Sequence, residues 1–478
     1  MGIAHCLLSA GMFLLFLGPG ARAAPEEFSL LRAIDYALTH NRDIELARLA
    51  AATTDIALAD ARASFLPVIS PRAGTGTGPD GTRTEYGFSV TERTQWGTSA
   101  NLAAQVTRDA ATTSDARYRG ILTITLEQPL LRRLGPLTNR EIVTAAESRY
   151  AAALRQVELR KAEIVTRVVE LHEQLVAIQQ QLAYARNAVE RLERLTELTR
   201  VRERQGRGAR VDTLRAETKL GSERLRLAGL EEQSRSLATS LADLLGLPPA
   251  TELIAIPGPR IELQAVEEAE ALNTAFSNRL DFAQVLHDLE DADRSVNIAR
   301  TELLPDLNLI THYERTGYGG SHSEAIRLDD DSWFVGLSLT MNLPLRHSRY
   351  ALRQTVLSRE AARLRLEASQ STIRREVLAA MLAWKRARAQ LPVAEQNYML
   401  AQKRAVLARR LFEAGKGDSF TVADAEDELR RAEENWLITQ SEQNIAACHL
   451  LHATGTLIQH PENLKPSAVR KWICPNRQ

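Results

Sequence analysis

Residues 61–69 read "ARASFLPVI", and residues 299–307 read "ARTELLPDL". The likeness extends backwards without a gap, because "ALTHNRDIELA" at 37–47 aligns with "AFSNRLDFAQV" at 275–285. A shared register of this length indicates internal duplication. We therefore expect the 478 residues to contain two copies of one structural unit.

Each copy changes from helix to strand at a Leu-Pro. Helical periodicity ends at Pro67 and at Pro305, since proline cannot continue a regular helix. Segments that alternate apolar with small or polar residues follow, which is the period of a strand with one apolar face. The expected strands are two in the first repeat (24–250), at about 98–108 and 120–129, and two in the second (251–460), at about 306–314 and 332–344. Whether 68–100 adds to the first strand or forms a loop stays open.

Long helical hairpins follow the strands. Apolar residues recur at alternating steps of three and four from Leu154 to Leu192 and again from Ile373 to Phe412. This is the spacing of a coiled-coil seam. A Gly-x-Gly interrupts each hairpin, because glycine readily enters the left-handed conformation of a tight reversal. The expected hairpins are about 139–245, with its tip at 205–212, and about 347–455, with its tip at 413–421.

The two ends of the chain are expected to lie outside the repeats. Residues 1–23 have an apolar run and a small-x-small cleavage site, as in a signal peptide. The alternative is an uncleaved anchor, although the run is shorter than the ~20 residues of a spanning helix. Residues 461–478 form a C-terminal tail, and it stays open whether Cys448 and Cys474 pair as a disulfide.

Composition and motifs argue against several classes of function. Lys+Arg and Asp+Glu both total 60 and aromatic residues are 5%, which gives no basis for nucleic acid as a partner. His172-Glu173 lacks the second histidine of a zinc-protease motif, and the glycine-rich 74–81 neither follows a buried strand nor opens a helix. We expect no catalytic residue, no cofactor and no metal site, and therefore no enzyme.

Strands and long helices impose a common requirement. Four strands cannot close a membrane barrel, and an open sheet edge in lipid leaves backbone groups without hydrogen bonds. Several chains must therefore share one barrel if the strands meet lipid, and three chains would supply twelve strands. A long apolar seam likewise needs neighbouring helices along its whole length.

These features resemble the TolC-like outer membrane efflux protein family. The resemblance rests on the paired Leu-Pro elements, "LEQPLL" at 126–131, the two glycine-containing tips and "VDTLRAE" at 211–217. It implies a mainly α fold with a β-barrel part: a homotrimer with a twelve-stranded barrel in outer membrane lipid and an α-barrel in the periplasm of a Gram-negative bacterium. It also implies a passive exit duct for efflux or type I secretion, docked through a periplasmic adaptor onto an inner-membrane RND or ABC transporter.

The resemblance assigns adaptor docking to the two tips. Gly206 and Gly415 match the tip glycines of the family. Residues beside them are expected to share the contact: Gly208, Ala209, Arg210, Gly417, Asp418 and Ser419.

The resemblance also places a gate at the periplasmic end. Asp424 matches an acidic residue that forms a charged ring around the threefold axis, and Thr421 stands where better-known members carry a second aspartate. Asp212 matches the aspartate that ties the helices closed. Its usual tyrosine and arginine partners are replaced by Phe412 and Gly417, neither of which makes the polar link, so this tie is expected to differ.

Two further expectations remain. Tyr313, Trp333 and Phe334 are candidates for an aromatic girdle at a membrane interface. The main alternative function is an exported coiled-coil scaffold with small β-modules and no channel. The cargo stays open among drugs, metal ions and proteins.

Overall fold

The computed structural model describes residues 26–79, 81–111, 117–248, 251, 253–264, 267–341 and 343–466. The expected signal peptide 1–23, most of the tail and Cys474 lie outside these residues, whereas Cys448 is buried. The chain divides into two compact units. The tip unit comprises Met1–Thr39, Arg167–Arg260 and Gln390–Asn444, and the sheet unit comprises His40–Thr166, Ile261–Ala389 and Ile445–Gln478, in each case as far as they are described. Each unit thus draws on both repeats.

Matching short helices precede the strands in both repeats. They are α1 (Leu30–His40) and α2 (Arg42–Ala63) in the first repeat, and α6 (Glu268–Asn278) and α7 (Leu280–Thr301) in the second. Asn41 starts α2, and its side chain accepts hydrogen bonds from the backbone N–H groups of Asp43 (2.9 Å) and Ile44 (3.2 Å). This cap separates α2 from α1.

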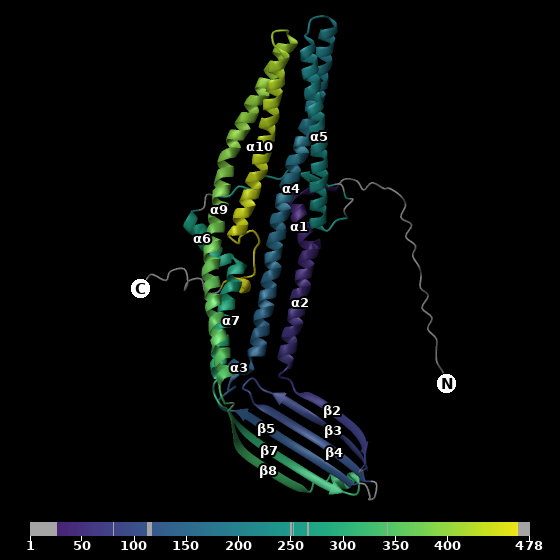
Figure 1. Cartoon of the computed structure of the whole chain (residues 1–478), viewed down its shortest axis with the longest axis vertical. Helices are drawn as coiled ribbons and strands as arrows, with labels where there is room; N and C mark the ends of the chain where they lie inside the picture. Colours follow the sequence, from purple (N-terminus) through teal and green to yellow (C-terminus); the bar gives the residue numbers. More distant parts are fainter. Residues whose placement is uncertain are drawn as a thin grey trace, which may run out of the picture. The chain divides into compact units, whose positions relative to one another are not determined.

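Four helices form the long hairpins. They are α4 (Glu141–Arg204), α5 (Arg210–Leu245), α9 (Arg346–Glu413) and α10 (Ser419–Ala453), labelled in Figure 1. The alanine-rich seam of α9 is buried in the tip unit, where Ala401, Ala405 and Ala408 pack with residues of α10. Gly246 ends α5 in a left-handed conformation (φ 79°), which stops the helix.

Minor elements complete the two units. They are the helices α3 (Pro136–Asn139), α8 (His322–Ala325) and η1 (Glu462–Leu464), and the parallel strand pair β1 (Glu26–Ser29) and β6 (Leu253–Ile256). In the tip unit the imidazole Nε2 of the fully buried His172 lies 3.1 Å from the carbonyl oxygen of Phe28, next to this pair. None of the described helices is long and apolar enough to cross a membrane.

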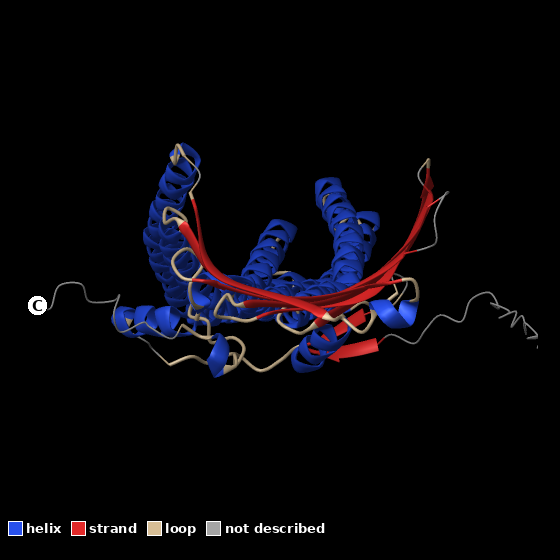
Figure 2. Cartoon of the chain, turned by 90° about the horizontal axis from the view of Figure 1, so that it is seen from below, coloured by secondary structure: helices blue, strands red, loops and turns tan. Residues whose placement is uncertain are grey.

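The sheet contains six strands in the described residues, in the order β2-β3-β4-β5-β7-β8 (Figure 1). All neighbours are antiparallel. The strands are β2 (Val68–Gly78), β3 (Gly81–Arg93), β4 (Ser99–Ala111), β5 (Arg117–Pro129), β7 (Asp306–Gly319) and β8 (Asp330–Thr340). The expected fold class, mainly α with a barrel-forming sheet, is confirmed, and within one chain the sheet is curved but not closed (Figure 2).

The expected count of four strands per chain is wrong, because 68–100 supplies the additional hairpin β2–β3. The sequence of β2, "VISPRAGTGTG", explains why the pattern did not reveal it. Beyond Ala73 only glycine and threonine follow in this strand, so there is no apolar alternation to detect.

The sheet has one apolar and one polar face. Cross-strand pairing aligns one residue from every strand into a single apolar row: Ile69, Val90, Leu102, Ile124, Tyr313 and Trp333. The neighbouring row on the opposite face is mostly polar: Ser70, Ser89, Ala103, Thr123, Glu314 and Ser332. Successive residues alternate faces, so Phe334 lies opposite Trp333, and only Trp333 and Tyr313 belong to the apolar side.

Candidate functional site

The two hairpin tips share one backbone geometry. Gly206 (φ 69°) and Gly415 (φ 72°) are both left-handed. Their N–H groups donate to carbonyls three residues back, at 2.9 and 3.0 Å, and those of Arg207 and Lys416 donate to carbonyls five residues back, both at 2.8 Å. This is the hydrogen-bond pattern of a Schellman turn, which satisfies the last carbonyls of a helix and requires glycine at the left-handed position.

The second glycine of each tip serves packing. A Cβ on Gly208 would lie 3.1 Å from the Cβ of Arg202, and one on Gly417 would lie 3.2 Å from the backbone nitrogen of Phe412. Each Gly-x-Gly therefore lets the chain reverse and pass close to its own helix. Residues 205–210 and 413–418 are all exposed, among them Ala209 and Arg210.

Two of the predicted site residues, Asp418 and Thr421, form the N-terminal cap of α10. The N–H of Thr421 donates to the carboxylate of Asp418 (2.9 Å), and its hydroxyl bonds the same oxygen. These hydrogen bonds from Thr421 lower the pKa of Asp418 below its usual range. Thr421 therefore acts here as a capping partner at the helix N-terminus.

Two contacts join the hairpins just below the tips, and we call them the inter-hairpin tie. The hydroxyl of the buried Ser419 donates to the carboxylate of Asp212. The guanidinium of Arg202 donates to the carbonyl of Phe412 (3.1 Å) and lies 4.4 Å from the centre of its ring. Asp212 thus has a partner on the facing hairpin, although its expected partners are missing, and Phe412 contributes its ring and carbonyl instead of a hydroxyl.

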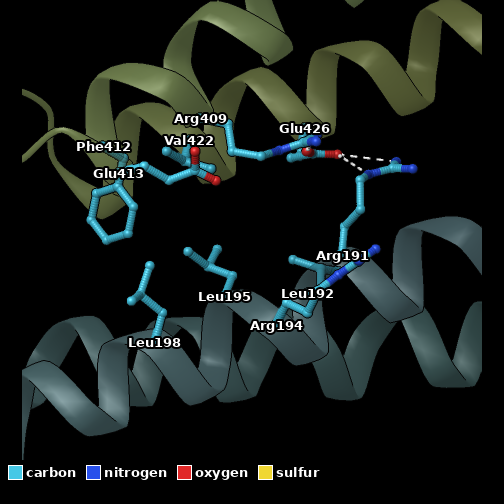
Figure 3. Close-up of a pocket in the computed structure, with 10 residues that line it drawn as sticks. All are labelled: Arg191, Leu192, Arg194, Leu195, Leu198, Arg409, Phe412, Glu413, Val422 and Glu426. Atoms are coloured by element: carbon cyan, nitrogen blue, oxygen red, sulfur yellow. Dashed lines mark hydrogen bonds and ion pairs between the residues drawn. The ribbon is translucent and has the colours of Figure 1, made fainter.

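The surface below the tie combines apolar packing with buried charge (Figure 3). Leu192, Leu195 and Leu198 of α4 face the other hairpin across a pocket that Phe412 and Val422 line from the opposite side.

Arg191 and Arg409 also line this pocket, where they share one carboxylate. Glu426, which is only 12% exposed, accepts from Arg191 of α4 at 3.2 Å and from Arg409 of α9 at 2.5 Å. Because one carboxylate serves two arginines from different hairpins, removing it would leave two cations facing each other.

Glu433 is a second acidic side chain in this interface. Burial raises its pKa to about 7, an effect that the charge of Arg191 opposes and that of Glu426 reinforces. One turn of helix away, Trp436 stacks on Tyr398 of α9 with ring centres 4.8 Å apart. Glu433 therefore exchanges a proton near neutral pH inside a packed helical interface.

Asp424 lies on an exposed part of α10. It pairs with Arg404 of α9 at 2.7 Å, and Arg404 also contacts Glu428. Both partners of the Asp424 pair are about half exposed, so the pair is screened by solvent. The sequence did not single out Arg404 or Arg202, because a helix-face arginine has no signature until its neighbour across the interface is known.

No group of three or more histidine, cysteine or acidic side chains that could hold a metal ion occurs in the part of the chain that the structure describes. The tips thus combine exposed turns with a polar tie between the two hairpins.

Comparison with known proteins agrees with this geometry. Residues 271–456 match the family model described as outer membrane efflux protein. Protein CyaE of Bordetella pertussis is 25% identical over 454 residues, which cover 90% of this chain and 85% of the relative.

Solved structures share the fold. The outer membrane protein VceC of Vibrio cholerae aligns with a TM-score of 0.68 and 19% identity, covering 89% of this chain and 96% of that one. The CmeC outer membrane channel of Campylobacter jejuni aligns with a TM-score of 0.70 and 15% identity, covering 92% and 88%. The chain therefore has the fold of these outer membrane channels, and residues 271–456 carry the match to the outer membrane efflux protein model, in agreement with the resemblance to the TolC-like family and with the location expected from it.

Proposed function

We propose that this chain is one subunit of a passive exit duct through the outer membrane. The observation that carries the proposal is the sheet, with one apolar face, one polar face and two edges that have no partner strand among the described residues. A sheet of this kind suits lipid only as part of a closed barrel, because every backbone group in lipid needs a hydrogen-bond partner. Its polar face then surrounds water.

The helical hairpins extend the duct into the periplasm. At ~1.5 Å per residue, the 64 residues of α4 amount to about 96 Å of helix. Exposed apolar residues such as Leu214, Leu225, Leu382 and Leu407 remain on the hairpins of a single chain. A homotrimer, in which hairpins of neighbouring subunits pack side by side, covers such residues.

The tips are the proposed docking surface for a periplasmic adaptor, which would link the duct to an inner-membrane RND or ABC transporter. Their matching geometry supports this role: two copies per chain, repeated in three chains, give six equivalent turns for one type of partner. The inter-hairpin tie lies directly below, so a partner that separates the tips would also strain the tie.

A second function, an exported coiled-coil scaffold, is disfavoured by the sheet. A scaffold has no need of an apolar row that crosses all six strands. The same architecture favours a transport role over catalysis. The proposal leaves the cargo to the inner-membrane partner.

Substitutions at the tip glycines test the docking role. Gly206→Val and Gly415→Val together place a β-branched residue at φ near +70°, where valine is strongly disfavoured. A photo-cross-linker at Lys416, analysed by mass spectrometry from intact cells, should trap the adaptor on the unaltered chain but not on the double variant. Gly221→Val in α5 is the control, because its backbone is helical and a Cβ there meets nothing within 4 Å.

The oligomer provides the second readout. The double variant should still form trimers in native electrophoresis, since neither substitution changes a residue of the sheet that forms the barrel wall. An adaptor that is captured equally by both proteins would remove the tips from the docking role.

A further inference from the structure

The two edge strands of the sheet are matched to each other. β2 and β8 are both 11 residues long, and each has a partner on one side only among the described residues. The six strands alternate in direction, so β2 and β8 run in opposite directions, and β2 begins at the end of the sheet where β8 ends. β2 of one copy therefore meets β8 of another in antiparallel orientation, as a barrel wall requires.

The hairpin β2–β3 is part of the wall rather than an appendage. β3 pairs with β4 without interruption from Gly81↔Ala111 to Arg93↔Ser99, and β2 pairs with β3 over its whole length. Both strands also contribute to the apolar row, through Ile69 and Val90. The row continues without a polar residue to Trp333 at the other edge.

The outer rows point to lipid at both edges. Ile69 on β2 is 68% exposed, and Trp333 on β8 is 74% exposed. Leu337 and Leu339, further along the apolar face of β8, are also about two-thirds exposed. Apolar side chains this exposed on an unpaired edge would invite aggregation in water, whereas in lipid they match their surroundings. The occupant that satisfies the edge backbone groups is a second copy of this chain.

We infer that β2 of each copy pairs with β8 of the next, and that three copies close an eighteen-stranded barrel instead of the twelve-stranded barrel implied by the family resemblance. The number three rests on the proposed function, whereas the pairing of the edges does not. With strands ~4.8 Å apart and tilted by ~40°, eighteen strands give a barrel about 36 Å across at the backbone, against about 24 Å for twelve.

The polar face of the added hairpin suits a wide lumen. β2 places Gly74, Gly76 and Gly78 on this face, so its distal half carries no side chains into the channel. Barrels of sixteen to eighteen strands leave an aqueous channel that side chains do not fill. The outer membrane part of this duct is therefore of porin width.

Disulfide cross-linking of the full-length chain in membranes tests the edge pairing. In a background with Cys448→Ala and Cys474→Ser, Ser70→Cys on β2 is combined in turn with Ser338→Cys and Thr340→Cys on β8. Because barrel strands are staggered, the scan also combines Gly76→Cys with Ser332→Cys. All five positions lie on the polar face.

The matched control moves the first cysteine to β4. Ala103→Cys is combined with the same β8 cysteines, because β4 would become the edge strand if the hairpin β2–β3 lay outside the wall. Each single-cysteine variant is the second control and should stay monomeric in denaturing electrophoresis.

The inference predicts that at least one β2–β8 pair gives covalent dimers and trimers, while the β4–β8 pairs give none. Cross-links from Ala103, or intact trimers without any β2–β8 cross-link, would overturn it. A protein that forms no trimer by light scattering in detergent would instead refute the proposed function, so the two failures are distinguishable.

Discussion

Removing Arg202 should loosen the tie between the two hairpins. Its guanidinium makes the only contact of the tie that combines a charge-assisted hydrogen bond, to the carbonyl of Phe412, with a ring contact to the same residue. A hydrogen bond from a charged group contributes about 1.5–3 kcal/mol, and a cation–π contact at a partly exposed site about 0.5–1 kcal/mol. We take about 2 kcal/mol for Arg202→Ala, since solvent replaces part of the hydrogen bonding.

A change of about 2 kcal/mol corresponds to a shift of about thirty-fold in the equilibrium between tied and untied hairpins in each subunit. The assay is single-channel recording in planar bilayers, in which the fraction of time spent in the high-conductance state reports separation of the tips. Arg202→Ala should raise this fraction strongly, and Phe412→Leu, which removes the ring but keeps the carbonyl, should raise it less.

Arg200→Ala is the matched control. Arg200 lies two residues away on α4, but its guanidinium bonds Glu217 on α5, within the same hairpin (3.0 and 2.7 Å). Arg200→Ala therefore removes a similar side chain without changing either contact of the inter-hairpin tie. The reasoning is refuted if Arg202→Ala opens no more often than the unaltered protein, or if Arg200→Ala opens equally often.

Three further predictions follow from single side chains. Burial raises the pKa of Glu433 to about 7, so between about pH 4.5 and 7 the folded protein retains a proton that the unfolded chain releases. The stability of the folded protein should therefore fall as pH rises through this window. Glu433→Gln should flatten the dependence of the melting temperature on pH, whereas the control Glu434→Gln should not. Asp424→Ala should reduce cation selectivity, measured as a shifted reversal potential in a salt gradient. The control is Asp427→Ala, which should leave the reversal potential unchanged because the carboxylate of Asp427 pairs with Lys219. Equal reversal potentials for the two variants would place Asp424 away from the pore. A Cβ on Gly317 would lie 2.3 Å from the carbonyl oxygen of Ala325. Gly317→Val should therefore displace the β7–β8 connection and expose it to protease on intact cells. The control Gly320→Val should leave the connection protected, because a Cβ on Gly320 meets nothing within 4 Å.

Elements with a strong period could be predicted from the sequence. The long helices follow from a seam that repeats over many turns, since α4 and α9 need the same apolar stripe along their whole length. The tip glycines were also predictable, because Gly206 and Gly415 lie where the chain reverses and the backbone takes a left-handed conformation that glycine adopts most readily.

Elements without such a period were missed. β2 consists largely of glycine and threonine, so its place in the sheet depends on pairing with β3 rather than on its own pattern. The four-residue strands β1 and β6 are too short to show any alternation. The tie could not be predicted either, because Arg202 and Phe412 lie on different hairpins and their contact depends on how these pack.

Electron microscopy of the full-length protein, solubilised from outer membranes in detergent, tests the central claim most directly. The account predicts a threefold particle in which a closed β-barrel continues into a cylinder of helices around one channel. Monomers, or oligomers whose sheets do not close into a barrel, would contradict the duct.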